Sequence, residues 1–211
     1  MADAFERARR VAVRTMRTAA WKHEIHGEDP SMAKHIPQLT RINNLGMITW
    51  NSQAGHNSRY FSKKTGKKEL SAERAYCVGF VRAESADAFI EWMWLHTDKY
   101  VARMGLADAT TDRMPGTIGV TVAQTGKVWD TSLSPFFQAQ DRNCNYPDTL
   151  FKTASTPARV KARAQIGAYL ESPVPETAVA VLLVDMRWGR KADGTKGLFT
   201  EIERALAHVG D

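Results

Sequence analysis

The feature that most constrains the fold is the apolar run "AVAVLLV" at residues 178–184, which is followed by Asp185. This run is far shorter than the roughly 18 apolar residues that a membrane-spanning helix needs. Short continuous runs rich in valine and leucine are typical of strands that are buried on both faces. The run therefore predicts a buried central strand of a sheet.

Helix and strand patterns alternate loosely along the rest of the chain. Apolar spacing and capping residues predict helices at residues 2–23, 27–43 (broken at Pro37), 86–105, 155–171 and 197–209. Runs rich in β-branched and aromatic residues predict strands at 45–51, 75–81, 117–123 and 127–133, the last two forming a hairpin, with a polar loop between Asn51 and Leu70. This order predicts a mixed α/β (α+β) fold, with mixed sheets flanked by helices, rather than a doubly wound sheet.

The positive charge of the chain is concentrated in two segments. Residues 1–22 hold six basic residues against two acidic ones, and residues 57–70 hold five against one. Taking these from the chain's 29 basic and 23 acidic residues leaves 18 and 20. The body is therefore slightly acidic, although the net charge is +6.

The first segment predicts a basic amphipathic helix. Its apolar side is formed by Phe5, Ala8, Ala12, Met16 and Ala19, and its basic side by Arg7, Arg10, Arg14 and Arg17. We treat residues 1–27 as this N-terminal helix and residues 28–211 as the main domain. Such a helix can bind nucleic acid, lie on an anionic membrane surface or act as an organellar presequence. Its two acidic residues argue against the presequence. The alternative is a surface helix docked on the domain with a solvated arginine face.

Common catalytic and metal-binding signatures are missing from the sequence. No P-loop, GxGxxG, GxSxG or HExxH pattern occurs. Two cysteines without CxxC spacing, and no secretory signal, favour a reducing, cytoplasmic location, with organellar import left open. His23 and His26 lie near acidic residues but have no third ligand at a suitable spacing, so we expect them to be solvent-exposed residues at a helix end rather than metal ligands.

The second basic segment, "NSRYFSKKTGKKEL" at 57–70, combines two aromatic residues with five cations. Such a mixture suits phosphate contacts and base stacking. The candidates for binding nucleic acid or another polyanion are Arg59, Lys63, Lys64, Lys67 and Lys68. The alternative is a solvated loop between two strands.

Polar residues gather at the tip of the strand predicted in "LGMITWNSQAG", residues 45–55. Strict alternation places Thr49 on one face, so Ser52 joins it only if the chain turns after Asn51. Loops at the ends of sheet strands are common ligand sites. The tip is therefore a candidate pocket wall.

Several segments, taken in order, resemble the C-terminal regulatory domain of eukaryotic methylenetetrahydrofolate reductase. "RINNLGMITWNSQAG" stands where that family has a Gly-Ile-Leu-Thr-Ile-Asn-Ser-Gln strand, and "ERAYCVGFV" where it has a Gln-Lys-Ala-Tyr strand that leads into a helix. "GTIGVTV", "DTSLSP" and "VAVLLVD" with "GLFTEIERAL" follow in the family's order. The resemblance covers roughly residues 30–210.

The resemblance implies a domain that binds S-adenosylmethionine, and S-adenosylhomocysteine competitively, as an allosteric signal in one-carbon metabolism. The family's ligand-contacting hydroxyls carry over to Thr49, Ser52, Thr117 and Thr131. A Glu-Thr pair of the family falls on Ser31 and Met32 here. We expect Glu28 or Asp29 to replace its carboxylate, because a negative charge offsets the ligand's ammonium or sulfonium.

The family's catalytic barrel needs about 250 residues, which this chain does not hold. We therefore expect a stand-alone sensor or regulatory subunit, without flavin, metal or catalytic residues, that acts with a protein partner or as a homodimer. Two alternatives stay open. One is an enzyme that consumes S-adenosylmethionine by methyl transfer, lyase chemistry or hydrolysis, for which no dedicated base or nucleophile is found. The other is a scaffold or nucleic-acid-associated protein that keeps only the fold, for example in an organelle or a viral assembly.

Overall fold

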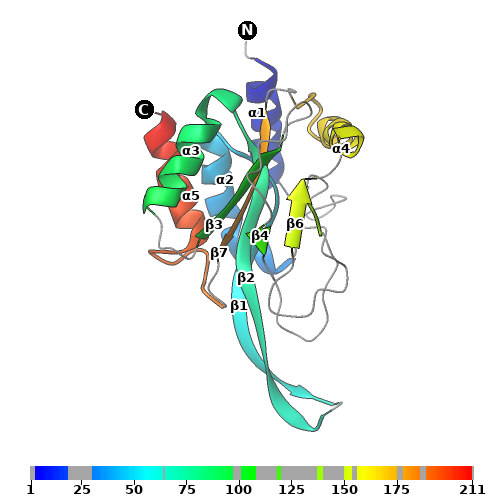
Figure 1. Cartoon of the computed structure of the whole chain (residues 1–211), viewed down its shortest axis with the longest axis vertical. Coiled ribbons are helices and arrows are strands. Elements are labelled where there is room, and N and C mark those ends of the chain that lie inside the picture. The colour runs from blue at the N-terminus through cyan, green and yellow to red at the C-terminus, as the bar shows by residue number, and fades with distance from the viewer. Residues whose placement is uncertain are drawn as a thin grey trace.

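The computed structural model describes residues 3–18, 30–63, 65–96, 101–107, 118–119, 137–139, 150–153, 156–174, 178–185 and 189–210. Its main sheet has the strand order β1-β2-β7-β3, formed by β1 (Ile48–Ser62), β2 (Lys67–Val81), β7 (Val179–Asp185) and β3 (Val101–Ala107) (Figure 1). Every residue of β7 is buried, and β7 lies between β2 and β3. The prediction of a buried central strand is therefore confirmed.

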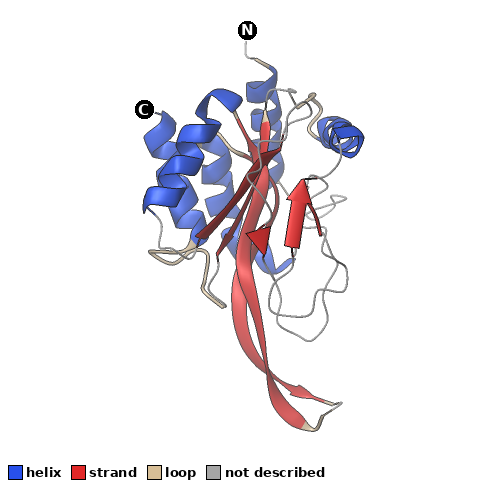
Figure 2. Cartoon of the chain, in the orientation of Figure 1, coloured by secondary structure: helices blue, strands red, loops and turns tan. Residues whose placement is uncertain are grey.

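Helices cover both faces of this sheet, so the predicted α+β class is confirmed (Figure 2). The 3₁₀ helix η2 (Pro30–His35) leads into α2 (Ile36–Asn44), and α2 packs with α3 (Ala83–His96) and α5 (Leu198–Gly210) over one apolar cluster. A second apolar cluster lies on the opposite face of the sheet. It is covered by α4 (Thr156–Tyr169) and by most of the buried face of α1 (Ala4–Arg17). We call these the α2/α5 face and the α1/α4 face. Helical spacing predicts that Phe199, Ile202, Leu206 and Val209 of α5 face inward. The first three are buried, and Val209 is partly buried against the same cluster.

A second, smaller sheet has the order β4-β6-β5, formed by β4 (Ile118–Gly119), β6 (Leu150–Thr153) and β5 (Phe137–Ala139). All strand pairings among the described residues are antiparallel, so the sheets mix no strand directions there. Within the predicted hairpin at 117–133, the described residues 118–119 pair with 150–151. The rest of that hairpin lies outside the described residues.

Two sequence predictions between Leu45 and Gly105 are wrong. The expected polar loop from Asn51 to Leu70 is instead a long antiparallel hairpin, in which β1 continues to Ser62 and pairs with β2. The expected helix over 86–105 ends at His96, and the segment 101–107 forms β3 against β7. In both places, pairing with a distant strand overrides a local pattern.

Helix α1 is part of the core on its predicted apolar side. Phe5, Ala8, Ala12 and Met16 are buried, as expected, whereas the helix ends at Arg17 rather than near His23. Arg9 attaches it to the C-terminal end of α2, where its guanidinium donates to the carbonyls of Asn43 and Asn44 at 2.9 and 2.8 Å. Carbonyls at the end of a helix lack partners within the helix, so a cation there is stabilising.

Among the described residues, no helix combines the length and the apolar character needed to cross a membrane.

Candidate functional site

Thr49 and Ser52, the two described hydroxyl residues of the expected pocket, lie on the same face of β1. Thr49 pairs with Gly79 and Ser52 with Cys77, and the register shift between them leaves Trp50 as an extra residue, a β-bulge. Residues directly opposite in an antiparallel pair share a face, and Cys77 belongs to the apolar cluster of the α2/α5 face. Thr49 and Ser52 are 4% and 2% exposed, so both hydroxyls are built into that face.

The mechanism that brings them together differs from the expected one. The sequence predicts a turn after Asn51, but the strand continues through this position to Ser62. One inserted residue shifts the alternation by one place, which has the same effect on side-chain direction as a turn.

Asn43, at the end of α2, holds Thr49 through a closed set of hydrogen bonds. The Thr49 N–H donates to Oδ1 of Asn43 at 3.0 Å, and Nδ2 of Asn43 donates to Oγ1 of Thr49 at 2.7 Å and to the Leu39 carbonyl at 2.8 Å. The backbone N–H and the carbonyl each have a single role, so the orientation of the amide is unambiguous. Asn43 is completely buried and ties α2 to the start of β1.

This arrangement determines what the Thr49 hydroxyl can still do. A hydroxyl carries one donor and can accept two hydrogen bonds. Because Asn43 donates to Oγ1, the proton of that hydroxyl must be directed toward a different acceptor. No hydrogen bond donated by Thr49 is present among the described residues. Within the described part of the chain, the Thr49 hydroxyl is thus held as an acceptor, and its own donor has no protein acceptor there.

The segment after β7, residues 189–197, lies against the middle of β1. The Ala192 N–H donates to the Ala54 carbonyl at 2.9 Å. Gly55, with φ +70°, permits a close approach, since a Cβ at this position would be 2.6 Å from the Arg190 carbonyl oxygen. Asp185, fully buried at the end of β7, forms an ion pair with the Arg190 side chain. These contacts place the segment beside Ser52, two residues before Ala54.

A buried histidine lies where η2 meets the same segment. His35 is 2% exposed, and its Nδ1 is 3.5 Å from Oδ2 of Asp193. Its ring packs edge-on against Phe199 at a centroid distance of 6.0 Å. Its Nε2 is buried without a hydrogen-bond partner among the described residues. Burial lowers the pKa of His35, an effect that the charge of Asp193 opposes in part.

Taken together, η2, the middle of β1 and the 189–197 segment meet on the α2/α5 face. They contribute a hydroxyl donor at Thr49, a second hydroxyl at Ser52 and an imidazole nitrogen at His35. Neutral and dipolar groups of this kind match the polar end of a small molecule.

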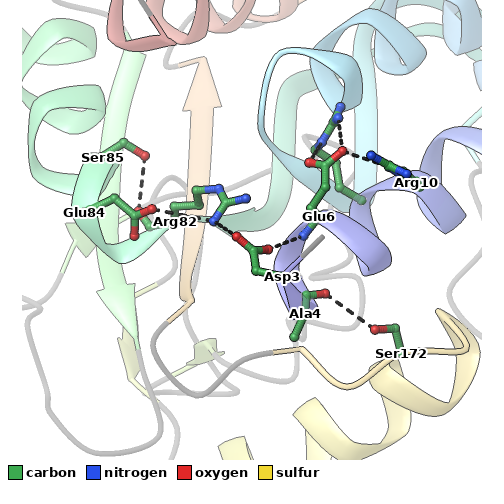
Figure 3. Close-up of polar contacts among 9 residues, drawn as sticks. Asp3, Ala4, Glu6, Arg10, Arg82, Glu84, Ser85 and Ser172 are labelled. Atoms are coloured by element: carbon green, nitrogen blue, oxygen red, sulfur yellow. Dashed lines mark hydrogen bonds and ion pairs between the residues drawn. The ribbon is translucent and has the colours of Figure 1, made fainter. Parts of the chain in front are cut away.

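A separate hollow of about 280 Å³ lies at the start of α1, lined by Asp3, Phe5, Arg82, Glu84 and three alanines. Figure 3 shows that Arg82 reaches Asp3, with Nη1 2.6 Å from Oδ2, and approaches Glu84 at 3.6 Å. Asp3 also caps α1 by accepting the Glu6 N–H at 2.7 Å. Hydrogen bonding to Asp3 raises the pKa of Arg82. Asp3 and Glu84 neutralise this cation, so the hollow is a poor site for an anion. The contact between Arg82 and Asp3 connects the start of α1 to the residue that follows β2.

The other predicted residues fall into two groups. Four of the five polyanion candidates are exposed along the β1–β2 hairpin, namely Arg59, Lys63, Lys67 and Lys68. The remaining predicted positions, and the two histidines considered as metal ligands, lie outside the described residues: Glu28, Asp29, Lys64, Thr117, Thr131, His23 and His26.

Three groups at the site were not predicted from the sequence. Asn43, His35 and Arg190 lie in helix ends or connecting segments, where polar residues are common. The only available signal was weak. Asn43 sits six residues before Thr49, and this spacing across a turn does not by itself indicate a contact.

Comparisons with known families and with curated proteins identify no relative. No family model matches the chain, and no curated protein matches it. Within the described part of the chain, histidine, cysteine, aspartate and glutamate side chains form no group of three that could hold a metal ion.

Proposed function

We propose that this protein is a sensor or regulatory subunit that binds S-adenosylmethionine and S-adenosylhomocysteine on the α2/α5 face of its main sheet. The proposal rests first on the ordered resemblance to the regulatory domain of methylenetetrahydrofolate reductase. Thr117, Thr131 and either Glu28 or Asp29 complete the proposed pocket.

The observation that carries the proposal is the shared face of Thr49 and Ser52. The resemblance selects these two hydroxyl residues, and strict alternation would separate them. The bulge at Trp50 aligns them. A bulge in an antiparallel pair commonly redirects a side chain beside a functional site.

The donor at Thr49 suits one end of the ligand. Both ligands carry an amino acid group, whose carboxylate accepts hydrogen bonds. Asn43 donates a hydrogen bond to the Thr49 hydroxyl oxygen. In the proposed complex, the hydroxyl proton of Thr49 is donated to an oxygen of the ligand's carboxylate. A donor held in position before binding loses little entropy when the ligand arrives.

Calorimetric titration with each ligand tests the proposal. Thr49→Ser keeps the hydroxyl and should keep binding, whereas Thr49→Val removes it and should weaken affinity about 5- to 150-fold, for a loss of about 1–3 kcal/mol. Thr40→Val is the matched control, because the Thr40 hydroxyl donates to the Ile36 carbonyl within α2. Melting curves without ligand show that each variant is folded at the titration temperature.

Three results would overturn the proposal. Wild-type protein that binds neither ligand at millimolar concentration would show that only the fold is shared with the reductase domain. Steady conversion of S-adenosylmethionine to products would establish an enzyme instead. A flavin spectrum in the purified protein would contradict the expectation that this chain is a regulatory domain that binds no flavin.

A further inference from the structure

The outer half of the β1–β2 hairpin extends beyond the sheet to which it belongs. β2 pairs with β7 only over Tyr76–Val81, so residues 67–75 of β2 have β1 as their sole partner among the described residues. Figure 1 shows this part projecting from the body as a two-stranded ribbon. We call residues 56–73 the arm. Isolated two-stranded ribbons are marginally stable, and a long exposed one adds little to a core.

The register of the arm sorts its residues between two faces. Phe61 lies directly opposite Lys68, and Arg59 is two residues before Phe61, so these three share one face. Phe61 is 64% exposed, and Arg59 and Lys68 are also exposed. The acidic residues Glu69 and Glu73 pair with Tyr60 and His56, which are positions of β1 that alternate with those of Arg59 and Phe61. One face therefore combines two cations with an aromatic ring.

The tip of the arm adds further positive charge. Lys63 lies in the turn and Lys67 at the start of β2, and both are exposed. None of the ion pairs among the described residues involves Arg59, Lys63, Lys67 or Lys68. Residues 57–70 carry a net charge of +4, out of +6 for the whole chain. This concentration on one projection complements a polyanion.

We propose that the arm binds duplex DNA by placing its ribbon in the major groove. B-DNA's major groove is about 12 Å wide and admits a two-stranded β-ribbon, whereas the A-form RNA groove is too narrow for side chains. The six residues Asn57–Ser62 span about 20 Å, or roughly six base pairs. Lys63, Lys67 and Lys68 contact phosphates, and Phe61 supplies an apolar contact of the kind made with thymine methyl groups.

Binding of the full chain to a labelled 20-base-pair duplex over a range of salt concentrations tests this proposal. A triple variant, Lys63→Gln, Lys67→Gln and Lys68→Gln, should bind at least about tenfold more weakly at 0.1 M salt, with a log–log salt slope shallower by about 2–3. The matched control, Lys34→Gln, Lys161→Gln and Lys196→Gln, removes the same charge from exposed positions on the body and should bind like wild type. Phe61→Ala should weaken binding without changing the salt slope.

Several results would overturn the proposal. Equal losses in the two triple variants would indicate nonspecific charge attraction, and equal affinity for heparin would indicate a general polyanion site. Preference for single-stranded DNA would exclude a groove-bound ribbon. Loss of self-association in the arm variant without loss of DNA binding would make the arm a contact between copies of this chain. Titrations with S-adenosylmethionine are independent of these outcomes, because the arm substitutions leave Thr49 and Ser52 intact.

Discussion

Asn43 and Thr49 share two hydrogen bonds of opposite direction, with Thr49 N–H donating to Oδ1 at 3.0 Å and Nδ2 donating to Oγ1 at 2.7 Å. The pair joins the end of α2 to the first residues of β1, next to the bulge at Trp50. Because Asn43 is fully buried, water cannot replace either bond. The same contact therefore stabilises the fold and orients the proposed ligand donor.

The first prediction concerns Asn43→Asp, which keeps the shape of the side chain and removes the Nδ2 donor. We expect a loss of about 3 kcal/mol or more in the free energy of unfolding at neutral pH, because a buried carboxylate would face the Leu39 carbonyl. Burial should raise the pKa of the new carboxyl, so its stability cost should shrink as the pH falls and the group is protonated. Chemical denaturation at pH 7 and pH 5 measures both effects.

Asn44→Asp is the control for this variant, since Asn44 is exposed at the next position. A carboxylate near the end of a helix should cost less than about 1 kcal/mol there. Equal costs for the two substitutions would show that the Asn43 amide does not hold Thr49.

The second prediction concerns Gly79, which lies opposite Thr49 and beside the bulge. A Cβ at this position would be 2.4 Å from the Ile48 carbonyl oxygen and 2.7 Å from Cε of Met47. Gly79→Ala should therefore destabilise the protein by about 1–3 kcal/mol or more, since the clash involves backbone of the paired strand. Gly210→Ala, where nothing lies within 4 Å, should have little effect. Comparable melting temperatures for the two variants would contradict the close approach of β1 and β2.

The third prediction concerns acid stability. Hydrogen bonds from Arg9 and Arg10 lower the pKa of Glu6 from 4.5 to about 2. A carboxyl with a lowered folded-state pKa contributes stability that is present above its unfolded value and is lost as the pH falls toward the folded value. Glu6→Gln should cost about 1–2 kcal/mol at pH 6, after allowance for partial exposure, and much less at pH 2.

Denaturant titrations at the two pH values measure this difference. Glu91→Gln, at an exposed position on α3, should show no such dependence. A cost for Glu6→Gln that stays constant between pH 6 and pH 2 would argue against the arginine contacts.

The fourth prediction concerns His35. Burial lowers its pKa, so the unfolded chain binds a proton more readily than the folded chain below a pH of about 6.5. The contribution of His35 to the free energy of unfolding is therefore fully present above pH 6.5, and it is lost as the pH falls toward the folded-state pKa. His35→Phe should remove this part of the decline between pH 7.5 and pH 5.5, as measured by denaturant titration. His208→Gln, at an exposed position, should leave the decline unchanged, and an unaltered slope in His35→Phe would refute the assignment.

Local sequence patterns predicted the elements whose character depends on neighbouring residues. The apolar run that ends at Asp185 predicted the central strand, and helical spacing predicted which sides of α1 and α5 are buried. Pro37 marked the boundary near which η2 gives way to α2. Each of these signals comes from residues within a few turns of one another, so a single sequence contains it.

Tertiary pairing decided the rest. The segment 101–107 became a strand because it pairs with β7, and the polar stretch after Asn51 became the arm because it pairs with residues 67–78. The shared face of Thr49 and Ser52 depends on a bulge, which exists only relative to the opposite strand. The order of the residues is enough to show which segments are apolar and at what spacing their apolar residues recur. Which of them pair, and in what register, was decided by contacts between residues far apart in the chain, whose energies no local pattern contains.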